Sequence, residues 1–437
     1  MSNVARLHEW LTTAATLAPG GTRDHLVTQA QEILLPTPAV HLDTTNEEVR
    51  AFLDNHPDLE VVTVIDENGH PSGLINRFIF AEAYSRPFSR EVYGKRSCIA
   101  WMDKDPLVMD EGTAIEDLVK AAVSKGPKVL KDGFIGTREG RFVGQGTGFS
   151  LLKAMEALEA EKTRQLLESI DYASAIQRSH LRNSDRHLGD ALKDYSLHWA
   201  PRDVVGGDCY FFRQTPEGLF GAIVDCTGHG VPGAFMTLIT LSYLSFLVGA
   251  RDGETNPGAV LTQLNRHIKE VLAQGNDVET VFPMDASGRS SDDGMDVAAF
   301  LLAPNGRSLL FSGAHLPLII TDVATGESRL VEGERMGIGY VRTPDAFVWA
   351  SETVALPEDS RVMVPTDGIT DQIGGPKRIS MGRKRLVEWL NSVCAQSAAS
   401  IGKEFLTHFE AWQGSQVRRD DATFLLFTPG STHPVTG

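Results

Sequence analysis

Phe-Gly-Ala-Ile-Val-Asp-Cys-Thr-Gly-His-Gly, residues 220–230, is an apolar run that ends at an aspartate and a glycine-rich turn. The run Phe220 to Val224 predicts a buried strand, and Asp225 follows at its end. A carboxylate carried by a rigid element makes a more exact site than one on a mobile loop. Beyond it, residues 228–240 predict a glycine-rich turn and then a buried helix with Pro232 in its first turn.

The same arrangement of aspartate and apolar run recurs along the chain. The other positions are Asp208 after Gly206 and Gly207, Asp296 before the run 297–302, Asp367 after the run 362–364, and Asp420 with Asp421 before the run 424–427. Each alone also fits a simple turn in which the aspartate bonds to its own backbone. Together in one cleft, such carboxylates would raise one another's pKa unless a cation sat between them. Because Mg²⁺ and Mn²⁺ prefer oxygen ligands, the set predicts a divalent metal site.

Five short motifs follow one another in a fixed order between residues 195 and 429. They are Gly-Gly-Asp, Asp-x-x-Gly-His-Gly, Ser-Gly-Ala-His-Leu-Pro at 312–317, Thr-Asp-Gly-Ile-Thr-Asp and Asp-Asp-Ala-Thr. This ordered set resembles the SpoIIE-type branch of the metal-dependent PPM protein phosphatases. The resemblance implies an α-β-β-α sandwich with two antiparallel sheets, a centre with two Mn²⁺ or Mg²⁺ ions, and hydrolysis of phosphoserine or phosphothreonine on a protein.

The resemblance also assigns roles to individual residues. Asp208 and Asp225 would hold the two metals and act in catalysis, with Asp225 bridging them. The backbone carbonyl of Cys226 would complete one coordination shell, and Asp367 and Asp420 would bind one of the two ions. Two such ions can share a hydroxide at neutral pH, which attacks phosphorus in line.

Several positions near these motifs stay open. Arg202 precedes Asp208 and could clamp a phosphate with its bidentate fork, or it could be a solvated loop arginine. Asp296 and Asp421 could reach a metal or could serve the structure alone. In the eukaryotic relatives, a histidine two residues after the bridging aspartate protonates the leaving group, but here that residue is Thr227. His229 is better explained as a turn or helix-start residue, so a metal-bound water is the expected acid.

The first 150 residues contain a repeated pattern of strand, turn and strand. The two copies lie at residues 61–75 and 134–144, and helical stretches at 46–55 and 113–124 flank them. The repeat resembles a pair of α/β CBS domains. Pairs that bind adenine nucleotides carry Ser or Thr and then Asp after the second strand; this chain has Asn76 and Phe80 in one copy, and Thr147 and Ser150 in the other. A nucleotide ligand is therefore in doubt, and a dimerisation or protein-contact role is at least as well supported.

A continuous helical pattern, residues 151–192, joins the two parts of the chain. Its apolar residues recur mostly three or four positions apart, and it contains no Gly or Pro before Gly189. The pattern fits a short parallel coiled coil or a helix packed on the catalytic domain. We therefore expect an α+β multidomain chain: a CBS-pair-like regulatory module at 1–150, a helical linker at 151–192, and a PPM phosphatase domain at 193–437.

Composition excludes some classes of function. The 437-residue chain has a formal net charge of −16, which argues against nucleic-acid binding. Its four cysteines show no Cys-x-x-Cys spacing, and no signal peptide or apolar run of about eighteen residues is evident. The longest apolar stretch, residues 235–250, fits a core helix. These features predict a cytoplasmic protein without a membrane segment.

These observations predict a homodimeric, metal-dependent serine/threonine phosphatase of bacterial signalling, regulated by its N-terminal module. By resemblance, its substrate is a small phosphorylated regulator of the STAS (anti-anti-sigma) type. Two alternatives stay open: a phosphatase of a small phosphorylated metabolite, and a scaffold in which the phosphatase fold mainly binds a partner. Retention of Asp208, Asp225, Asp367 and Asp420 argues against the scaffold.

Overall fold

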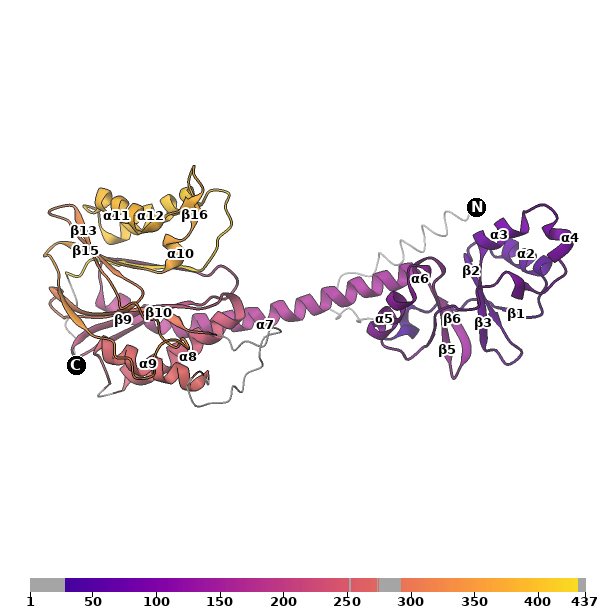
Figure 1. The fold of residues 1–437 in the computed structure, drawn as a ribbon, viewed down its shortest axis with the longest axis horizontal. Helices are drawn as coiled ribbons and strands as arrows, with labels where there is room; N and C mark the ends of the chain where they lie inside the picture. The colour runs from indigo at the N-terminus through magenta and orange to yellow at the C-terminus, as the bar shows by residue number, and fades with distance from the viewer. Residues whose placement is uncertain (1–27, 251–252, 273, 275–291, 431–437) are drawn as a thin grey trace. The chain divides into compact units, whose positions relative to one another are not determined.

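The computed structural model describes residues 28–250, 253–272, 274 and 292–430 (Figure 1). The chain divides into two compact units, Met1–Leu166 and Leu167–Gly437. The division falls within the long helix α7, Gly148–Ala191. This helix confirms the predicted helical stretch at 151–192.

The N-terminal unit is built from two copies of one topology. In the first copy a sheet forms from β1 (Val40–His41), β2 (Val61–Ile65) and β3 (Pro71–Asn76), and helices α2 (Asn46–Asn55) and α3 (Arg77–Tyr84) follow β1 and β3. The second copy has β4 (Val108–Asp110), β5 (Phe134–Arg138) and β6 (Arg141–Gly146), with α5 (Ile115–Lys125), α6 (Lys128–Asp132) and the start of α7. In each copy, the first strand pairs parallel and the third antiparallel with the second strand. The predicted repeat is therefore confirmed.

The remaining short elements of this unit are η1 (Ala30–Ile33), α4 (Ser89–Tyr93) and η2 (Cys98–Ala100). The two sheets contact each other through Val61, Leu74 and Ile135, and Gln145 donates a hydrogen bond to the Val61 carbonyl across the contact. Asn76 and the Thr147–Ser150 pair, at the places compared with nucleotide-binding CBS pairs, cap helices. Asn76 accepts from the backbone of α3, and Thr147 and Ser150 bond to each other at the start of α7.

The second unit is a sandwich of two five-stranded sheets (Figure 1). The first sheet has the order β14-β11-β10-β9-β8, and its strands are Glu352–Ala355, Ser308–Ala314, Met295–Leu302, Gly218–Cys226 and Asp208–Thr215. The second has the order β13-β12-β15-β18-β7, and its strands are Glu327–Val331, Leu318–Asp322, Ser360–Pro365, Ala422–Phe427 and Tyr195–Ala200. Every pairing in both sheets is antiparallel. The predicted sandwich of two antiparallel sheets is confirmed, as are the four strands predicted beside the aspartates.

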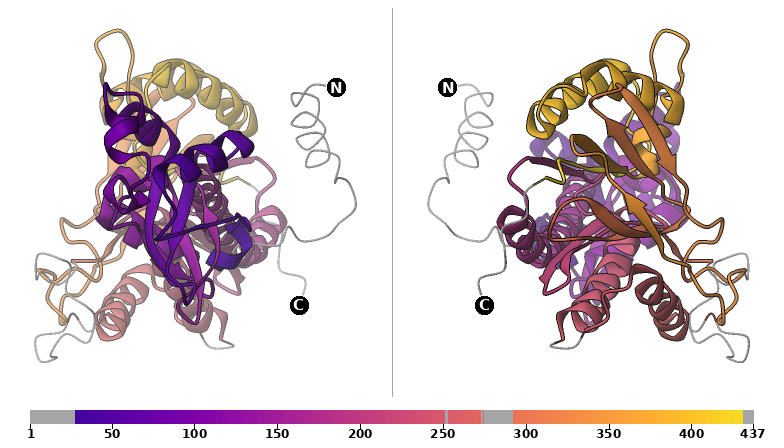
Figure 2. Two further views of the ribbon diagram at one scale, coloured as in Figure 1. Left: turned by 90° about the vertical axis from the view of Figure 1, so that its right-hand side faces the viewer. Right: turned by 90° about the vertical axis from the view of Figure 1, so that its left-hand side faces the viewer.

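Helices cover the outer face of each sheet (Figure 2). Helices α8 (Gly230–Gly249) and α9 (Pro257–Val271) pack on the first sheet, and α11 (Gly382–Val393) and α12 (Ala398–Gln413) pack on the second. The apolar core runs between the two sheets and under these helices, with Phe300 and Phe427 stacked across it. The short elements α10 (Asp367–Thr370), β16 (Ile373–Gly374) and β17 (Ile379–Ser380) follow β15.

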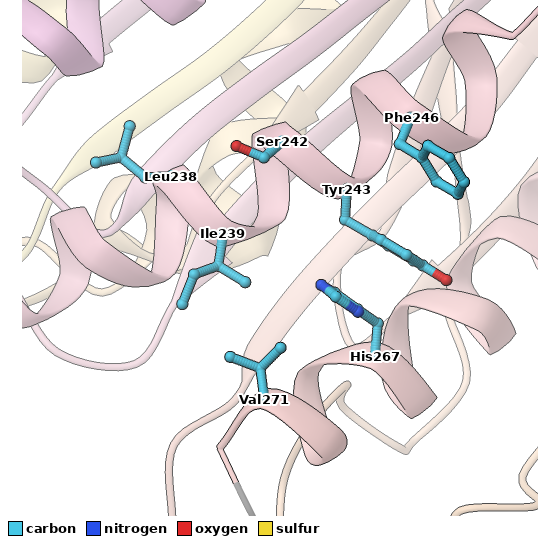
Figure 3. A pocket seen from close by; sticks show the side chains of 7 residues that line it. All are labelled: Leu238, Ile239, Ser242, Tyr243, Phe246, His267 and Val271. Atoms are coloured by element: carbon cyan, nitrogen blue, oxygen red, sulfur yellow. The ribbon is translucent and has the colours of Figure 1, made fainter.

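Helix α8 is also the one helix among the described residues that is long and apolar enough to cross a membrane. Half of its most apolar window is buried inside the structure, and the helix contacts β8 and β9. That packing is the one expected for a core helix. Its outer side forms a shallow apolar groove with α9, in which Tyr243 stacks on His267 at a ring-centroid distance of 3.8 Å (Figure 3).

His198 makes folding stability depend on pH. It lies on β7 opposite Phe424, and its Nε2 is buried without a hydrogen-bond partner. Burial, followed by the charge of Arg418, lowers the pKa of His198 from 6.5 to about 4. As pH falls from 6.5 towards 4, the unfolded chain binds a proton that the folded chain does not, and stability is lost.

We therefore expect His198→Leu to weaken this pH dependence. The fall in the free energy of unfolding between about pH 7 and about pH 4.5 should be smaller in the variant by about 1–2 kcal/mol. Urea denaturation of both proteins at both pH values measures this difference. An equal fall in the two proteins would rule out His198 as a source of acid sensitivity.

Candidate functional site

Three carboxylates form a row across one end of the first sheet. Asp208 begins β8 and is paired with Asp225 near the end of β9, and Asp225 is paired in turn with Asp296 near the start of β10. Directly opposed residues of antiparallel strands project from the same face of a sheet, with their Cβ atoms about 5 Å apart. Strand register therefore brings together three aspartates that are separated by up to 88 positions in the sequence.

The second sheet adds acidic residues at the same end of the sandwich. Asp367 begins α10 directly after β15, and Asp420 lies just before β18, the neighbour of β15. Thr366 joins the two sheets, because its Oγ1 donates to Oδ2 of Asp208 at 2.9 Å and its backbone N–H donates to the Thr423 carbonyl. Asp208 is only 1 % exposed, whereas Asp367 and Asp420 are exposed. The acidic site is thus closed at Asp208, partly open at Asp225 and Asp296, and open on the side of the second sheet.

Glycines allow the close approach of the loops around this site. A Cβ on Gly207 would lie 2.8 Å from the carbonyl oxygen of Cys226 and 2.5 Å from that of Gly228. A Cβ on Gly368 would lie 1.8 Å from the Asp421 carbonyl oxygen. The glycines before Asp208 and after Asp367 are therefore required by packing, and Gly207 sits against the carbonyl that sequence analysis predicts as a ligand.

The carboxylates raise one another's pKa. Burial raises the pKa of Asp225 well above its usual value, and the neighbouring Asp208, Asp367, Asp420 and Asp296 raise it further. Burial and the charge of Asp420 raise the pKa of Asp367, and burial likewise raises that of Asp208. The aspartates therefore lie close enough together to oppose one another's ionisation.

This donor set fits a divalent cation. Among the described residues, no three His, Cys, Asp or Glu side chains converge tightly enough to enclose an ion. Like charges repel at this spacing, so carboxylate oxygens converge only around a cation that offsets them. Four aspartates from two sheets, together with a backbone carbonyl at Cys226, provide the all-oxygen set that Mg²⁺ and Mn²⁺ prefer.

Asp421 holds the loop that leads into Asp208. Its Oδ1 accepts from the backbone N–H of Arg202 at 2.5 Å, and its Oδ2 accepts from those of Gly207 and Asp208 at 2.5 and 3.2 Å. Asp421 is 2 % exposed. Both oxygens of Asp421 thus accept hydrogen bonds from the backbone, which favours a structural role over metal binding. The Arg202 side chain is exposed and donates to the Arg419 carbonyl at 3.1 Å, at the edge of the acidic site.

Thr227 stands two residues after Asp225, at the position compared above with the histidine of the eukaryotic relatives. Thr227 bonds to the carbonyl and the N–H of Gly294, so it serves the loop before β10. His229 is the N-cap residue of α8, is exposed, and pairs with Asp203 at 2.8 Å. A second histidine pairs with Asp296: His315 Nδ1 lies 2.8 Å from Asp296 Oδ1. The sequence contains His315 within a recognised motif, but gives no sign of this contact.

Gln177 of α7 is a further residue that sequence analysis did not identify. It is fully buried, donates to the Gly206 carbonyl at 2.8 Å and to Thr237 of α8 at 2.9 Å, and lies 3.4 Å from the Gly206 N–H. Gly206 lies two residues before Asp208. Gln177 therefore connects the long helix, helix α8 and the loop that places the first aspartate of the site.

The second unit is similar to known protein phosphatases. The family description of stage II sporulation protein E (SpoIIE) matches residues 215–429. The chain is similar to the SiaA PP2C domain of Pseudomonas aeruginosa, with 30% sequence identity over 62% of this chain and 99% of that one, and a TM-score of 0.52. It is similar to the PP2C phosphatase domain and regulatory-domain fragment of SpoIIE from Bacillus subtilis, with 14% identity over 54% of this chain and 64% of that one, and a TM-score of 0.41.

The N-terminal unit has a weaker counterpart. A CBS-domain protein of Agrobacterium tumefaciens is 16% identical over 31% of this chain and 99% of its own length, with a TM-score of 0.25, so the CBS assignment stays a prediction. No protein with a curated description matches the chain significantly. The family match falls on the sandwich that contains the acidic site, and the similarity to SiaA, at 30% identity, extends over nearly the whole of that domain. The chain belongs to the SpoIIE family of PP2C-type protein serine/threonine phosphatases.

Proposed function

We propose that this phosphatase is metal-dependent and removes phosphate from a phosphoserine or phosphothreonine of a small STAS-like regulatory protein in bacterial partner switching. The main support is the set of four aspartates, 208, 225, 367 and 420, at the shared end of both sheets. Because Asp367 and Asp420 are exposed, a phosphorylated side chain on the surface of a folded protein can approach this end. Family membership supports the proposed class of substrate.

In this proposal Asp208, Asp225, Asp367, Asp420 and the Cys226 carbonyl hold two Mn²⁺ or Mg²⁺ ions. When bound, such ions generate a nucleophile from water at neutral pH and offset the charge of the phosphoryl group. Asp225 lies in the middle of the row, between Asp208 and Asp296. This central position supports the proposal that Asp225 would be the ligand shared by both ions. Asp421 fixes the loop that begins at Arg202, so that Asp208 enters the site in one position.

Arg202 is the proposed phosphate clamp. Its guanidinium is exposed and donates a hydrogen bond to the Arg419 carbonyl, so it can turn towards a bound phosphate. Arg202→Lys keeps the charge but loses the bidentate fork. A clamp therefore predicts a raised KM in this variant with little change in metal requirement.

The substrate is tested with purified protein, Mn²⁺, a panel of STAS proteins phosphorylated on serine or threonine, and a panel of small phosphoesters such as sugar phosphates. The proposal predicts a kcat/KM for one or more phospho-STAS proteins that exceeds every small phosphoester by a factor of about 100 or more, because a protein partner contributes contacts away from the phosphate. Preference for a small phosphoester would support the metabolite alternative and contradict the proposal.

The N-terminal unit contains a cleft of about 420 Å³ between its two copies. Asp58, Glu60 and Asp132 line it, together with a single lysine, Lys131. Three carboxylates around one lysine oppose the binding of a polyphosphate. The lining therefore weighs against an adenine nucleotide and favours a regulatory role based on contacts between proteins.

We propose that the protein is a homodimer paired along α7. Leu151 and Ala154 pack on the N-terminal unit, but Met155, Leu166, Leu167 and Tyr172 are 42%, 65%, 52% and 71% exposed on a single chain. Exposed apolar residues of this kind on a long helix are expected where two such helices pair. The four cysteines are all unpaired, which agrees with a reducing, cytoplasmic location.

Charges placed at these exposed apolar positions should separate the dimer. We expect the full chain to have the mass of a dimer in light scattering, and Leu166→Arg with Tyr172→Arg to have the mass of a monomer, because the variant puts like charges on both helices where they pair. Val417→Arg is the control, since Val417 is 80% exposed on a loop of the phosphatase unit. Equal masses for the double variant and the wild type would exclude α7 as the contact.

A further inference from the structure

His315 lies beside the row that contains the site aspartates. It follows Ala314, the last residue of β11, which pairs with Val297 of β10. Its imidazole contacts Asp296, and Asp296 is paired with Asp225 on the neighbouring strand β9. A single side chain, that of Asp296, thus links the imidazole to the row beside the proposed bridging aspartate.

The backbone of His315 is held in an uncommon conformation. His315 has a φ of 61°, a left-handed conformation that is uncommon for a residue with a Cβ. Its N–H donates to the Glu334 carbonyl, and Glu334 N–H donates to the Gly313 carbonyl, so the turn is held on both sides. A residue kept in such a conformation by its surroundings is often functional.

Asp296 fixes the orientation of the imidazole. Its Oδ1 lies 2.8 Å from His315 Nδ1 and 3.5 Å from the Tyr340 hydroxyl, and burial raises the pKa of Asp296 while His315 lowers it. Arg342, stacked 5.6 Å over the Tyr340 ring, is the nearby cation, and Asp225 is the nearby anion on β9. Because Nδ1 faces Asp296, the Nε2 edge of the ring points away from this carboxylate. Among the described residues, no hydrogen bond engages Nε2, and the His315 side chain is 28% exposed.

We propose that His315, oriented by Asp296, donates the proton that the serine or threonine oxygen takes up as it leaves phosphorus. A water oxygen forms the new bond to phosphorus, the bond from phosphorus to Oγ breaks, and its electron pair goes to Oγ. The Nε2 proton of His315 passes to Oγ, which leaves as a hydroxyl. The proton released by the water returns to the imidazole through solvent. Thr227 bonds to Gly294 and His229 pairs with Asp203, so neither residue is the proposed proton donor.

The test compares two leaving groups. His315→Asn suits the left-handed backbone, since Asn tolerates positive φ. For a phosphoserine peptide, whose alkoxide needs a proton, we expect kcat to fall about 100-fold, within the usual range for general acid catalysis. For p-nitrophenyl phosphate, whose leaving group needs no proton near neutral pH, we expect a fall of less than about threefold, because only the protonation step is lost. Asp296→Asn should show the same selectivity with a smaller loss.

His229→Asn is the matched control, because His229 also pairs with an aspartate at 2.8 Å but lies at the start of α8. It should leave both substrates unaffected. If His315→Asn folds poorly, His315→Gly with added imidazole replaces it, since glycine adopts positive φ freely. Imidazole should restore turnover of phosphoserine and leave p-nitrophenyl phosphate unchanged.

Equal losses on both substrates, a selective loss in His229→Asn, or no loss would overturn the proposal. A changed Mn²⁺ concentration for half-maximal activity in His315→Asn would assign His315 to metal binding and would also overturn it. The inference rests on the phosphatase activity and site proposed above. If those are wrong, the wild-type protein turns over neither substrate; if only the inference is wrong, the wild type remains active on both.

Discussion

Asp225→Asn lowers phosphatase turnover by at least about 100-fold, the scale on which activity falls when groups around a metal are removed. The variant keeps the shape of the side chain but loses one charge from the centre of the aspartate row. It should also need more Mn²⁺ for half-maximal activity. The same change removes a buried carboxylate whose pKa is raised by burial and by four neighbouring aspartates. The metal-free variant should therefore unfold at a higher temperature than the metal-free wild type at neutral pH.

Asp322→Asn is the matched control for this prediction. Asp322 is paired with Ser360 at the start of β15, whereas Asp367 follows the end of that strand, so the control lies at the opposite end of the sandwich. It should change neither turnover nor the Mn²⁺ requirement. Near wild-type turnover in Asp225→Asn, with metal bound, would show that the bridging role is wrong. Loss of turnover together with lower metal-free stability would indicate misfolding.

Gln177→Ala should destabilise the phosphatase unit by about 2–4 kcal/mol, because the buried backbone groups of Gly206 lose their partner and a cavity opens beside Thr237. Since Gly206 leads into Asp208, turnover should fall by about tenfold under conditions in which the variant is folded, as expected for a displaced catalytic group. Urea denaturation and phosphatase assays measure the two effects.

The control is Gln165→Ala on the same helix. Gln165 is exposed and bonds to Glu161 within one turn, so its loss should change the free energy of unfolding by less than about 0.5 kcal/mol. If Gln177→Ala were as stable and as active as Gln165→Ala, the contact between α7 and the Gly206 loop would have no energetic weight. If Gln177→Ala were destabilised but fully active, Gln177 would stabilise the fold without helping to place Asp208.

The strands beside the site could be predicted from sequence because each apolar run has an aspartate near one of its ends. Phe220 to Val224 lies in β9 and the run after Asp296 lies in β10, as expected. The repeat in the N-terminal unit could be predicted equally well, because a glycine marks the turn after each second strand, Gly69 after β2 and Gly140 after β5. Both glycines adopt a positive φ in the structure.

The contacts of His315 and Gln177 could not be predicted in this way. His315 meets Asp296, nineteen positions earlier in the chain, because β10 pairs with β11 and the turn after β11 brings the imidazole back to the start of β10. Gln177 is one polar position in a helix, and it is buried only when α8 and the Gly206 loop pack against it. Helical spacing identifies the faces of a helix but not what covers a face.

The central claim, that this aspartate row makes a metal-dependent phosphatase, is tested most directly by removing and restoring metal. Protein stripped with EDTA and freed of chelator is assayed on a phosphoserine substrate before and after addition of Mn²⁺ or Mg²⁺. Our account predicts loss of turnover to below about 1% and recovery on adding either ion, because activation of water depends on the bound cation. Full turnover by the stripped protein would contradict it.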